Sequence, residues 1–378
     1  MVLAVAAACS PFGLLCLYKV VSAPEPLYPD FFGLWSFGRY VLLCPPATIY
    51  DAGRMQAFQV GLGMPAEYGY AFHYPPWVLL LLAPFGLLPY RAALGAWLLV
   101  TFGAYLLVLR PWRWPWPAAA LLLAAPSTVL CLTVGQTGFA TAALLLGGLA
   151  LLPMRPVLAG ALLGMLAFKP QLALMVPFVL LFGWHWRAAG GASLSVAALT
   201  LAGYVAFGPG LWGAWFDYMR GAGATLAAGS GELLDLMPTV TSAVLLLGGG
   251  TVLARLAQAA AAAAAIWAVW RFRRAPDQPD AQAATALASL LATPYALYYD
   301  LPAVTGAVTA VLAVRLARLG QAFPPPQLPL LLACVATPLL LPVRAGVLAS
   351  VVPAFLALGL WTLCRQVVRA EAGLPVSE

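Results

Sequence analysis

Residues 91–109 read RAALGAWLLVTFGAYLLVL, an almost uninterrupted apolar run close to the roughly 20 residues that a helix needs to cross a bilayer. Similar runs recur along most of the 378 residues, of which 63% are hydrophobic and only 8% charged. A soluble domain carries roughly 25% charged residues. The composition therefore excludes a water-soluble globule and predicts an all-α polytopic membrane protein that forms a single integral membrane domain over residues 1–378.

The apolar segments predict about twelve crossings, several of them shorter than a full span. We expect the first to be an uncleaved helix, since residues 1–8 lack the basic start of a signal peptide. Residues 76–89 would make only about 21 Å of helix, and we interpret them as re-entrant or interfacial. The segments lie at approximately 1–23, 91–109, 118–132, 139–153, 156–168, 171–184, 190–207, 238–270, 282–293, 301–319, 328–342 and 345–363.

The positions of the arginines predict the orientation, because Lys and Arg in short loops stay on the cytoplasmic side. With the amino terminus inside, eleven of the nineteen basic residues face the cytoplasm. Residues 24–75, with interfacial helices, and a second loop at 208–237 are then extracytoplasmic. Counting 76–89 as a full crossing would invert every later segment. The basic residues clearly outside are Arg39, Arg54, Arg220 and Arg344.

Polar side chains that border or interrupt apolar runs are functional candidates, because an ionisable group at membrane depth is costly. In the predicted topology the candidates meet at the outer leaflet, which predicts a pocket there. They are Asp30 after the first helix, His73 in the aromatic cluster 72–76, Gln136 in the polar island 135–138, Lys169 in Lys169-Pro170-Gln171, and Asp300 ahead of the helix at 301.

Each candidate also has an ordinary structural interpretation. Asp30 and Asp300 suit the starts of helices, where a carboxylate accepts bonds from free amides. Lys169 can extend its ammonium to the lipid headgroups. Gln136 suits a turn between two helices, and His73 suits a hydrogen-bonded loop position. Residue type alone does not choose between these interpretations and a catalytic site.

Taken in order, six short motifs resemble glycosyltransferase family 87, whose members are membrane enzymes of the GT-C architecture that use polyprenyl-phosphate sugars. The motifs extend over roughly residues 28–302, most of the chain. They are Asp30-Phe31, Ile49-Tyr50-Asp51, Phe72-His73-Tyr74-Pro75-Pro76, Gly135-Gln136, Lys169-Pro170-Gln171, and Thr293-Pro294 leading to Tyr299-Asp300.

The resemblance implies a GT-C-type fold and transfer of a mannose-like hexose from a polyprenyl-phosphate donor to a hydroxyl of a lipid or glycan acceptor. It places the reaction at the outer face of the plasma (inner) membrane, among membrane lipids, without cofactor or metal. Asp30 would act as the general base that takes the proton of the acceptor hydroxyl. Lys169, Arg54 and Arg220 would bind the donor phosphate. The substrate-binding residues would be Asp51, His73, Tyr74, Gln136, Tyr299 and Asp300.

One departure from the family pattern leaves the identity of the sugar open. Many mannosyltransferase members carry histidines after the late Ser/Thr-Pro, whereas this chain reads TPYALYYD at 293–300. Tyr299 and Asp300 then stand where those histidines would hold donor phosphate or acceptor.

Two other functions fit the same composition. A transporter or lipid flippase would use the broken helices at 135–138 and 169–171 as binding ends, without covalent chemistry. A silent scaffold would use the polar loop to bind partners. Other classes are excluded: no spacing suits zinc, a nucleotide phosphate or a hydrolase nucleophile, and the net charge of +7 is too scattered to bind nucleic acid.

Overall fold

The computed structural model describes residues 1–22, 30–227, 231–317, 326–340 and 349–371, and within these ranges every regular element is a helix. The predicted helical class is thereby confirmed. A helix suits a membrane protein because it satisfies its backbone hydrogen bonds internally. Residues 24–29 of the first predicted loop, and Arg344 with the rest of 341–348, lie outside the described residues.

The helices fall into a long and a short group. The long ones are α1 (Val2–Ser22), α5 (Tyr90–Leu109), α11 (Trp186–Phe207), α12 (Pro209–Ala227), α14 (Thr251–Arg271) and α19 (Val352–Glu371). The short ones are α2 (Asp30–Leu43), α3 (Ala52–Gly61), α4 (Val78–Gly86), α6 (Trp116–Ala124), α7 (Pro126–Val134), α8 (Gly138–Leu151), α9 (Pro156–Met165), α10 (Val176–Phe182), α13 (Val240–Leu246), α15 (Pro279–Ala292), α16 (Pro302–Ala317) and α17 (Gln327–Ala336). Turns of 3-10 helix are η1 (Pro46–Thr48), η2 (Pro111–Arg113), η3 (Leu166–Phe168), η4 (Gly231–Leu236), η5 (Tyr298–Asp300) and η6 (Thr337–Leu339).

Three of the described helices are long and apolar enough to cross a membrane. They are Tyr90–Arg113, which joins α5 to η2, and the helices α11 and α14. Helices α6 and α7 meet at a bend of 46° and make a fourth span if they act together. With its shorter apolar helices the chain is membrane-integral, while the number of about twelve crossings stays a prediction.

Several segments differ in detail from the expected ones: the predicted loop 208–237 contains the helix α12, and 118–132 is divided between α6 and α7. Residues 238–270 form two helices, α13 and α14, because the glycines at 248–250 end the first, with Gly248 at φ 81°. The expected segment 171–184 becomes turns followed by the seven residues of α10. Within 76–89, α4 has nine residues and packs against α2.

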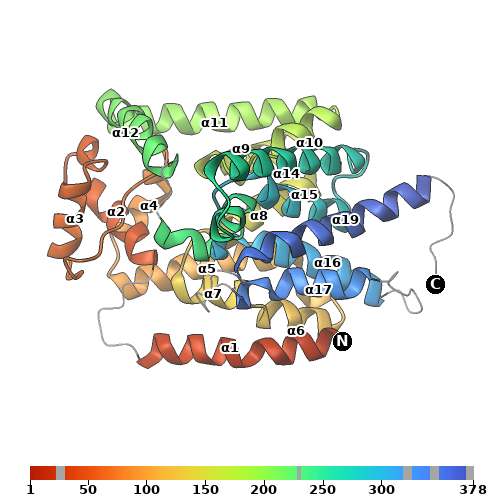
Figure 1. Ribbon diagram of the computed structural model, residues 1–378. Coiled ribbons are helices and arrows are strands. Elements are labelled where there is room, and N and C mark those ends of the chain that lie inside the picture. The colour runs from red at the N-terminus through yellow and green to blue at the C-terminus, as the bar shows by residue number, and fades with distance from the viewer. Residues whose placement is uncertain (23–29, 228–230, 318–325, 341–348, 372–378) are drawn as a thin grey trace.

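Helices α1 and α11 lie on opposite sides of the molecule, with α8 between them (Figure 1). Helices α2, α3, α4 and α12 gather at one end, whereas the first residue and the end of α19 lie towards the other (Figure 1). The described parts of both predicted outer loops, 24–75 and 208–237, therefore lie at the same end of the protein.

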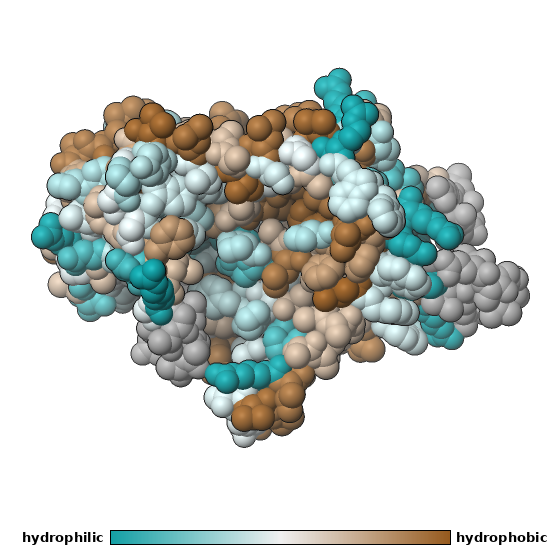
Figure 2. Space-filling view, turned by 90° about the horizontal axis from the view of Figure 1, so that it is seen from above, coloured by the Kyte–Doolittle hydropathy of each residue, from teal (hydrophilic) through white to brown (hydrophobic). Residues whose placement is uncertain are grey.

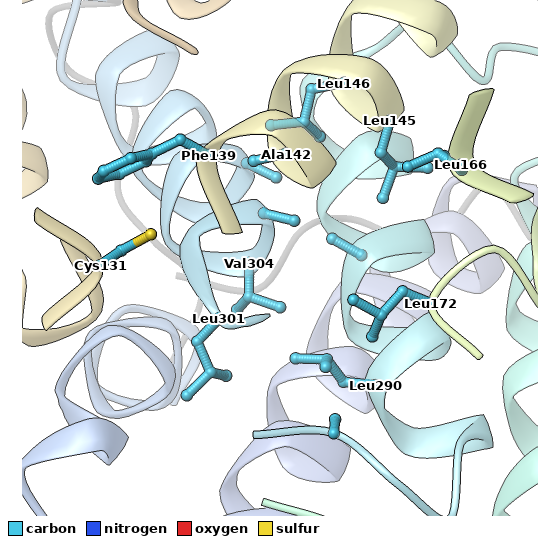
Figure 3. Packing of buried hydrophobic residues seen from close by; sticks show 14 of the residues in the cluster. Cys131, Phe139, Ala142, Leu145, Leu146, Leu166, Leu172, Leu290, Leu301 and Val304 are labelled. Carbon is cyan, nitrogen blue, oxygen red and sulfur yellow. The ribbon is translucent and has the colours of Figure 1, made fainter. Parts of the chain in front are cut away.

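Helix α8 is the centre of the packed interior. Figure 3 shows Phe139, Leu145 and Leu146 of α8 in one buried cluster with Val304 of α16 and Leu290 of α15. All five side chains are at most 2% exposed. A helix that is apolar on every face is buried on every face. The hydrophobicity of α8 thus reports burial within the protein.

The face seen from above carries abundant hydrophobic side chains, and strongly hydrophilic ones lie mostly near its edges (Figure 2). Helix α11, on this side of the molecule, exposes Leu194, Leu201 and Val205, the last of them 76% exposed. A surface this apolar is unfavourable in water and suits contact with lipid chains.

Helices α9 and α11 form the most extensive helix pair, and glycines set their separation. A Cβ on Gly160 would collide with the carbonyl oxygen of Ala188, and one on Gly191 with that of Val157. Gly160 and Gly164 form a small-xxx-small pattern, which lets two membrane helices approach closely.

We expect Gly160→Ala to destabilise the protein by about 1–3 kcal/mol, because the helix backbones must separate to admit the methyl group. Thermal unfolding of the purified protein in detergent measures the effect. Gly190→Ala is the matched control on α11, where an added Cβ meets nothing within 4 Å. Equal unfolding midpoints for the two variants would show that α9 and α11 do not approach as described.

Candidate active site

A buried ion pair joins Lys169 to Asp300. The ammonium Nζ lies 2.7 Å from Oδ1 of the carboxylate, and the two residues are 5% and 3% exposed. The second carboxylate oxygen accepts a hydrogen bond from the backbone N–H of Leu297 at 3.1 Å. Nζ also lies 4.9 Å from the centroid of the Tyr299 ring. Such a pair holds two distant segments together, because removing either charge leaves the other uncompensated.

The local sequence positions both charges at breaks between helices. Lys169 directly follows η3, and Pro170 prevents the helix from continuing because it lacks a backbone N–H. Asp300 ends η5, directly ahead of Leu301 and the helix α16. Each side chain therefore projects from a helix end into the interior.

Asp30 is the first residue of α2 and is half-buried. Burial raises the pKa of its carboxyl, the side-chain hydrogen bond with Gln136 and the Lys169 ammonium lower it, and the result lies above the ordinary value of an aspartate. A carboxylate with a raised pKa is a better proton acceptor than an exposed one. Asp30 is thus equipped to act as a base.

The polar island 135–138 lies between the two acidic segments. Gly135 ends α7 at φ 68°, and a Cβ there would lie 2.6 Å from Cβ of Phe31. A Cβ on Gly138, where α8 begins, would collide with the carbonyl oxygen of Tyr299. Only glycine admits both contacts, so the island is clamped between the Asp30 segment and the Asp300 segment.

Five tyrosines lie near enough to the Asp30 carboxylate to interact with it electrostatically. Tyr74 and Tyr299 were among the sequence candidates, but the other three were not, although the signal was present in the tyrosine-rich stretches 68–74 and 295–299. Tyrosine offers a flat ring and a hydroxyl, a combination that suits a sugar. The five are Tyr70, Tyr74, Tyr295, Tyr298 and Tyr299.

His73 lies beside this cluster and is bonded to a different helix. Its Nδ1 is 2.5 Å from the hydroxyl of Tyr218 on α12. Tyr50 packs against the same Tyr218 ring and donates its hydroxyl hydrogen to the carbonyl of Tyr74 at 2.7 Å. These contacts tie α12 to the segment that carries His73 and Tyr74.

The remaining three candidates form local pairs on the exposed surface. Asp51 accepts the backbone N–H of Arg54 at the start of α3, and its carboxylate is 3.5 Å from Arg54 Nε. Arg220 lies 2.7 Å from Asp217. Exposed pairs of this kind contribute little to stability. The structure does not bring Asp51, Arg54 or Arg220 to the buried pair.

An apolar cavity of about 270 Å³ lies next to the polar cluster. Its lining comes from α2, α4, α5, α8 and α9 with η3, and includes Leu34, Leu82, Val100 and Leu144. Tyr74, Thr137 and Phe168 connect the cavity to the site, because they are neighbours of His73, Gln136 and Lys169 in the chain. The arrangement places an apolar compartment beside a charged one.

The part of the chain that the structure describes contains no evident metal-binding site. No group of three or more His, Cys, Asp or Glu side chains gathers there in a way that could hold an ion. Transfer without a metal stays a prediction.

Fold and site together define a class: a membrane-integral helical protein with a carboxylate in a tyrosine-rich polar cluster beside an apolar cavity. Residues 72–294 match the model of glycosyltransferase family 87, more than half of the chain, and the protein belongs to this family. Membership implies glycosyltransferase activity. Comparisons with curated proteins and with solved structures returned no match.

The matched residues cover only part of the site. His73, Tyr74, Gln136 and Lys169 fall within 72–294, whereas Asp30 and Asp300 lie outside it. Contacts in the folded protein connect these two acids to the matched region, through Gln136 and Lys169 respectively.

Gln136 offers a direct test of how the pKa of Asp30 is set. Its hydrogen bond favours the ionised carboxylate, so Gln136→Met should raise the pKa of Asp30 further. The base form is then lost at a higher pH, and the acidic limb of the pH–rate profile should move upward. Gln56→Met, which removes an exposed amide bonded to Ala66, is the control. An unmoved limb in Gln136→Met would contradict this role.

Proposed function

We propose that this glycosyltransferase moves a hexose from a polyprenyl-phosphate donor to a hydroxyl of a lipid or glycan acceptor, with Asp30 as the general base. The observation that carries the proposal is the half-buried Asp30, which is hydrogen-bonded to Gln136 and interacts electrostatically with nearby tyrosines. A carboxylate in this setting can accept the proton of a bound acceptor hydroxyl. An exposed aspartate would not hold that hydroxyl in position.

The chemical step requires few protein groups. Asp30 takes the proton of the acceptor hydroxyl as its oxygen forms a bond to the anomeric carbon, and the bond from that carbon to the phosphate oxygen breaks. The phosphate leaves with the bonding electron pair as a stable anion, so the sugar is transferred with inversion. The Lys169 ammonium donates a hydrogen bond to Asp300, and its positive charge favours the anionic leaving group.

The apolar cavity supports a lipid-linked donor over a soluble nucleotide sugar. A polyprenyl chain can remain in an apolar environment while its head reaches the polar cluster. The apolar cavity, with the polar residues Gln136 and Lys169 beside it, offers both environments. The GT-C architecture fits such an arrangement of short and broken helices.

Transfer is tested with the purified protein in proteoliposomes that contain a radiolabelled polyprenyl-phosphate hexose and a lipid acceptor extract. We expect label to move covalently to the acceptor, and no transfer from a nucleotide sugar. Passage of labelled donor across the bilayer without covalent change would overturn the proposal in favour of a flippase.

The proposal places the site at the outer face of the plasma (inner) membrane, on the basis of the arginine distribution. Glu67 is exposed in the segment 24–75, next to the tyrosine-rich stretch. In a Cys44→Ser background, Glu67→Cys should react with a membrane-impermeant maleimide in sealed right-side-out vesicles. Labelling only after the vesicles are opened would place the site on the cytoplasmic side.

A further inference from the structure

The amino terminus of α8 is buried and receives no side-chain cap from Thr137, while the Cys131 thiol lies against the amides of Gly138 and Phe139. Thr137 precedes the helix, and its side chain makes no capping hydrogen bond to the first turn. The first amides of a helix have no partner within the helix, and a threonine at this position ordinarily satisfies one of them. Here the helix of fourteen residues starts in the interior, next to Gln136, with its positive end directed at the polar cluster.

The Thr137 hydroxyl itself is unpartnered. The residue is 4% exposed, and its Oγ1 has no hydrogen-bond partner within the described residues. Thr137 lines the apolar cavity. A buried hydroxyl without a partner is unusual in a folded protein and calls for a ligand or a water molecule.

A second unpartnered donor lines the same cavity. Trp97 on α5 is 7% exposed, its ring packs against Phe31 and Phe85, and its Nε1 has no partner within the described residues. An indole N–H can only donate, so it requires an acceptor. Two free donors from different helices therefore border a compartment whose other lining is almost entirely apolar.

The Lys169 ammonium, paired with the Asp300 carboxylate, lies next to this compartment. Phe168 lines the cavity, and Lys169 follows it directly in the chain. Tyr74, another lining residue, interacts electrostatically with the Lys169 ammonium and with the Asp300 and Asp30 carboxylates. A helix amino terminus with a neighbouring ammonium group favours an anion rich in acceptor oxygens, and a phosphate is the common example.

We propose that the amino terminus of α8, the Thr137 hydroxyl and the Trp97 indole N–H bind the phosphate of an isoprenoid phosphate, whose chain occupies the cavity. Thr137 and Trp97 act as positioning residues for the lipid donor. The inference rests on the proposed function for the identity of the donor, but the binding itself can be measured without transfer. It assigns the phosphate to groups other than the exposed Arg54 and Arg220.

Binding of farnesyl phosphate to the purified full-length protein, compared with uncharged farnesol, tests the site. We expect the protein to bind farnesyl phosphate more tightly than farnesol, and Thr137→Val to weaken farnesyl phosphate at least about tenfold, as for a lost hydrogen bond to a charged group. Farnesol affinity should stay the same, because the valine preserves the volume. Trp97→Phe should act in the same direction.

Matched controls separate binding from folding. Thr309→Val removes a buried hydroxyl that donates to the Thr305 carbonyl at 2.7 Å, far along the chain from α8, and should leave both affinities unchanged. Thr137→Ser keeps the hydroxyl and should retain tight binding. Unfolding midpoints identify any variant that fails to fold. If Thr137→Val does not fold, Trp97→Phe provides the comparison between farnesyl phosphate and farnesol.

The outcomes distinguish this inference from the proposed function. Equal affinity of the parent and folded Thr137→Val for farnesyl phosphate would overturn the inference, as would equal affinity of the parent for farnesyl phosphate and farnesol. If the protein still transfers hexose from a polyprenyl-phosphate donor in that case, the proposed function holds and only the proposed phosphate site is wrong. If the parent protein transfers no hexose from a polyprenyl-phosphate donor, the proposed function is wrong, whichever lipid it binds.

Discussion

Asp30→Asn is expected to lower the rate of hexose transfer by about 10²- to 10⁴-fold, the usual contribution of a positioned general base. Asparagine has nearly the same shape but cannot take the proton of the acceptor hydroxyl. It can still bond to Gln136 and pack at the start of α2, so the protein should fold. The rate is measured with purified protein and labelled donor, alongside thermal unfolding.

Glu67→Gln is the matched control for this variant. Glu67 is an exposed carboxylate within the same segment, 24–75, and its loss should leave the transfer rate unchanged. A folded Asp30→Asn protein that transfers hexose at the parent rate would remove Asp30 from the mechanism. A large loss in Glu67→Gln would show that the overall charge of the segment, rather than one base, controls the rate.

The raised pKa of Asp30 also determines how activity depends on pH. A base must be ionised to accept a proton, and Asp30 becomes protonated at a higher pH than an exposed aspartate, whose pKa is about 3.9. The rate should therefore begin to fall on acidification at a higher pH than the one at which an exposed carboxylate protonates. The direction follows from burial, because the surroundings disfavour the charged form.

Lys169→Met is expected to destabilise the protein by about 3–5 kcal/mol, because it leaves the Asp300 carboxylate buried without its counter-charge. The double variant Lys169→Met/Asp300→Leu should regain most of that loss, since apolar residues of similar volume often replace a buried pair at little cost. Denaturant titration in mixed micelles measures both. Neither variant should recover full hexose transfer, because both lack the ammonium.

This pair of variants separates structure from chemistry. A double variant that is stable but inactive would assign the ammonium a role in the reaction. Recovery of both stability and transfer would make the ion pair purely structural. Arg220→Met, which breaks the exposed pair with Asp217, is the surface control and should leave stability close to that of the parent protein.

Much of the polar cluster was accessible from the sequence, because unusual residues interrupt apolar runs there. Gln136 and Lys169 stand out against their leucine-rich neighbours, and a proline breaks the helix beside Lys169. What no pattern revealed was the partner of each group. The Lys169–Asp300 pair joins residues 131 positions apart, and such a contact depends on the whole packing arrangement.

Other residues that the sequence singled out lie on the surface, away from the buried pair. Asp51 and Arg54 were singled out by motif and by charge, but they satisfy each other three residues apart at the start of α3. A sequence motif reports residue type and order, whereas it does not report whether a side chain faces the interior. Tyr295 and Tyr298 were overlooked for the same reason: their role depends on the position of Asp30.

The number of membrane crossings could not be counted from hydropathy alone, because helices buried in the protein are also apolar. Helices such as α8 and α16 are as apolar as a membrane span because other helices surround them. Hydrophobic runs measure removal from water and do not distinguish lipid from protein. The long helices α5, α11 and α14 were identified because their length adds a second criterion.

The separation of Lys169 from Asp300 has a consequence for biogenesis. Ribosomes add about 5–20 residues per second, so the lysine is synthesised roughly 7–26 s before the carboxylate that neutralises it. During that interval the nascent chain carries an orphan cation that is destined for the interior. The insertion machinery must shelter it until the later part of the chain emerges, and a chain cut short before Asp300 would expose it to quality control.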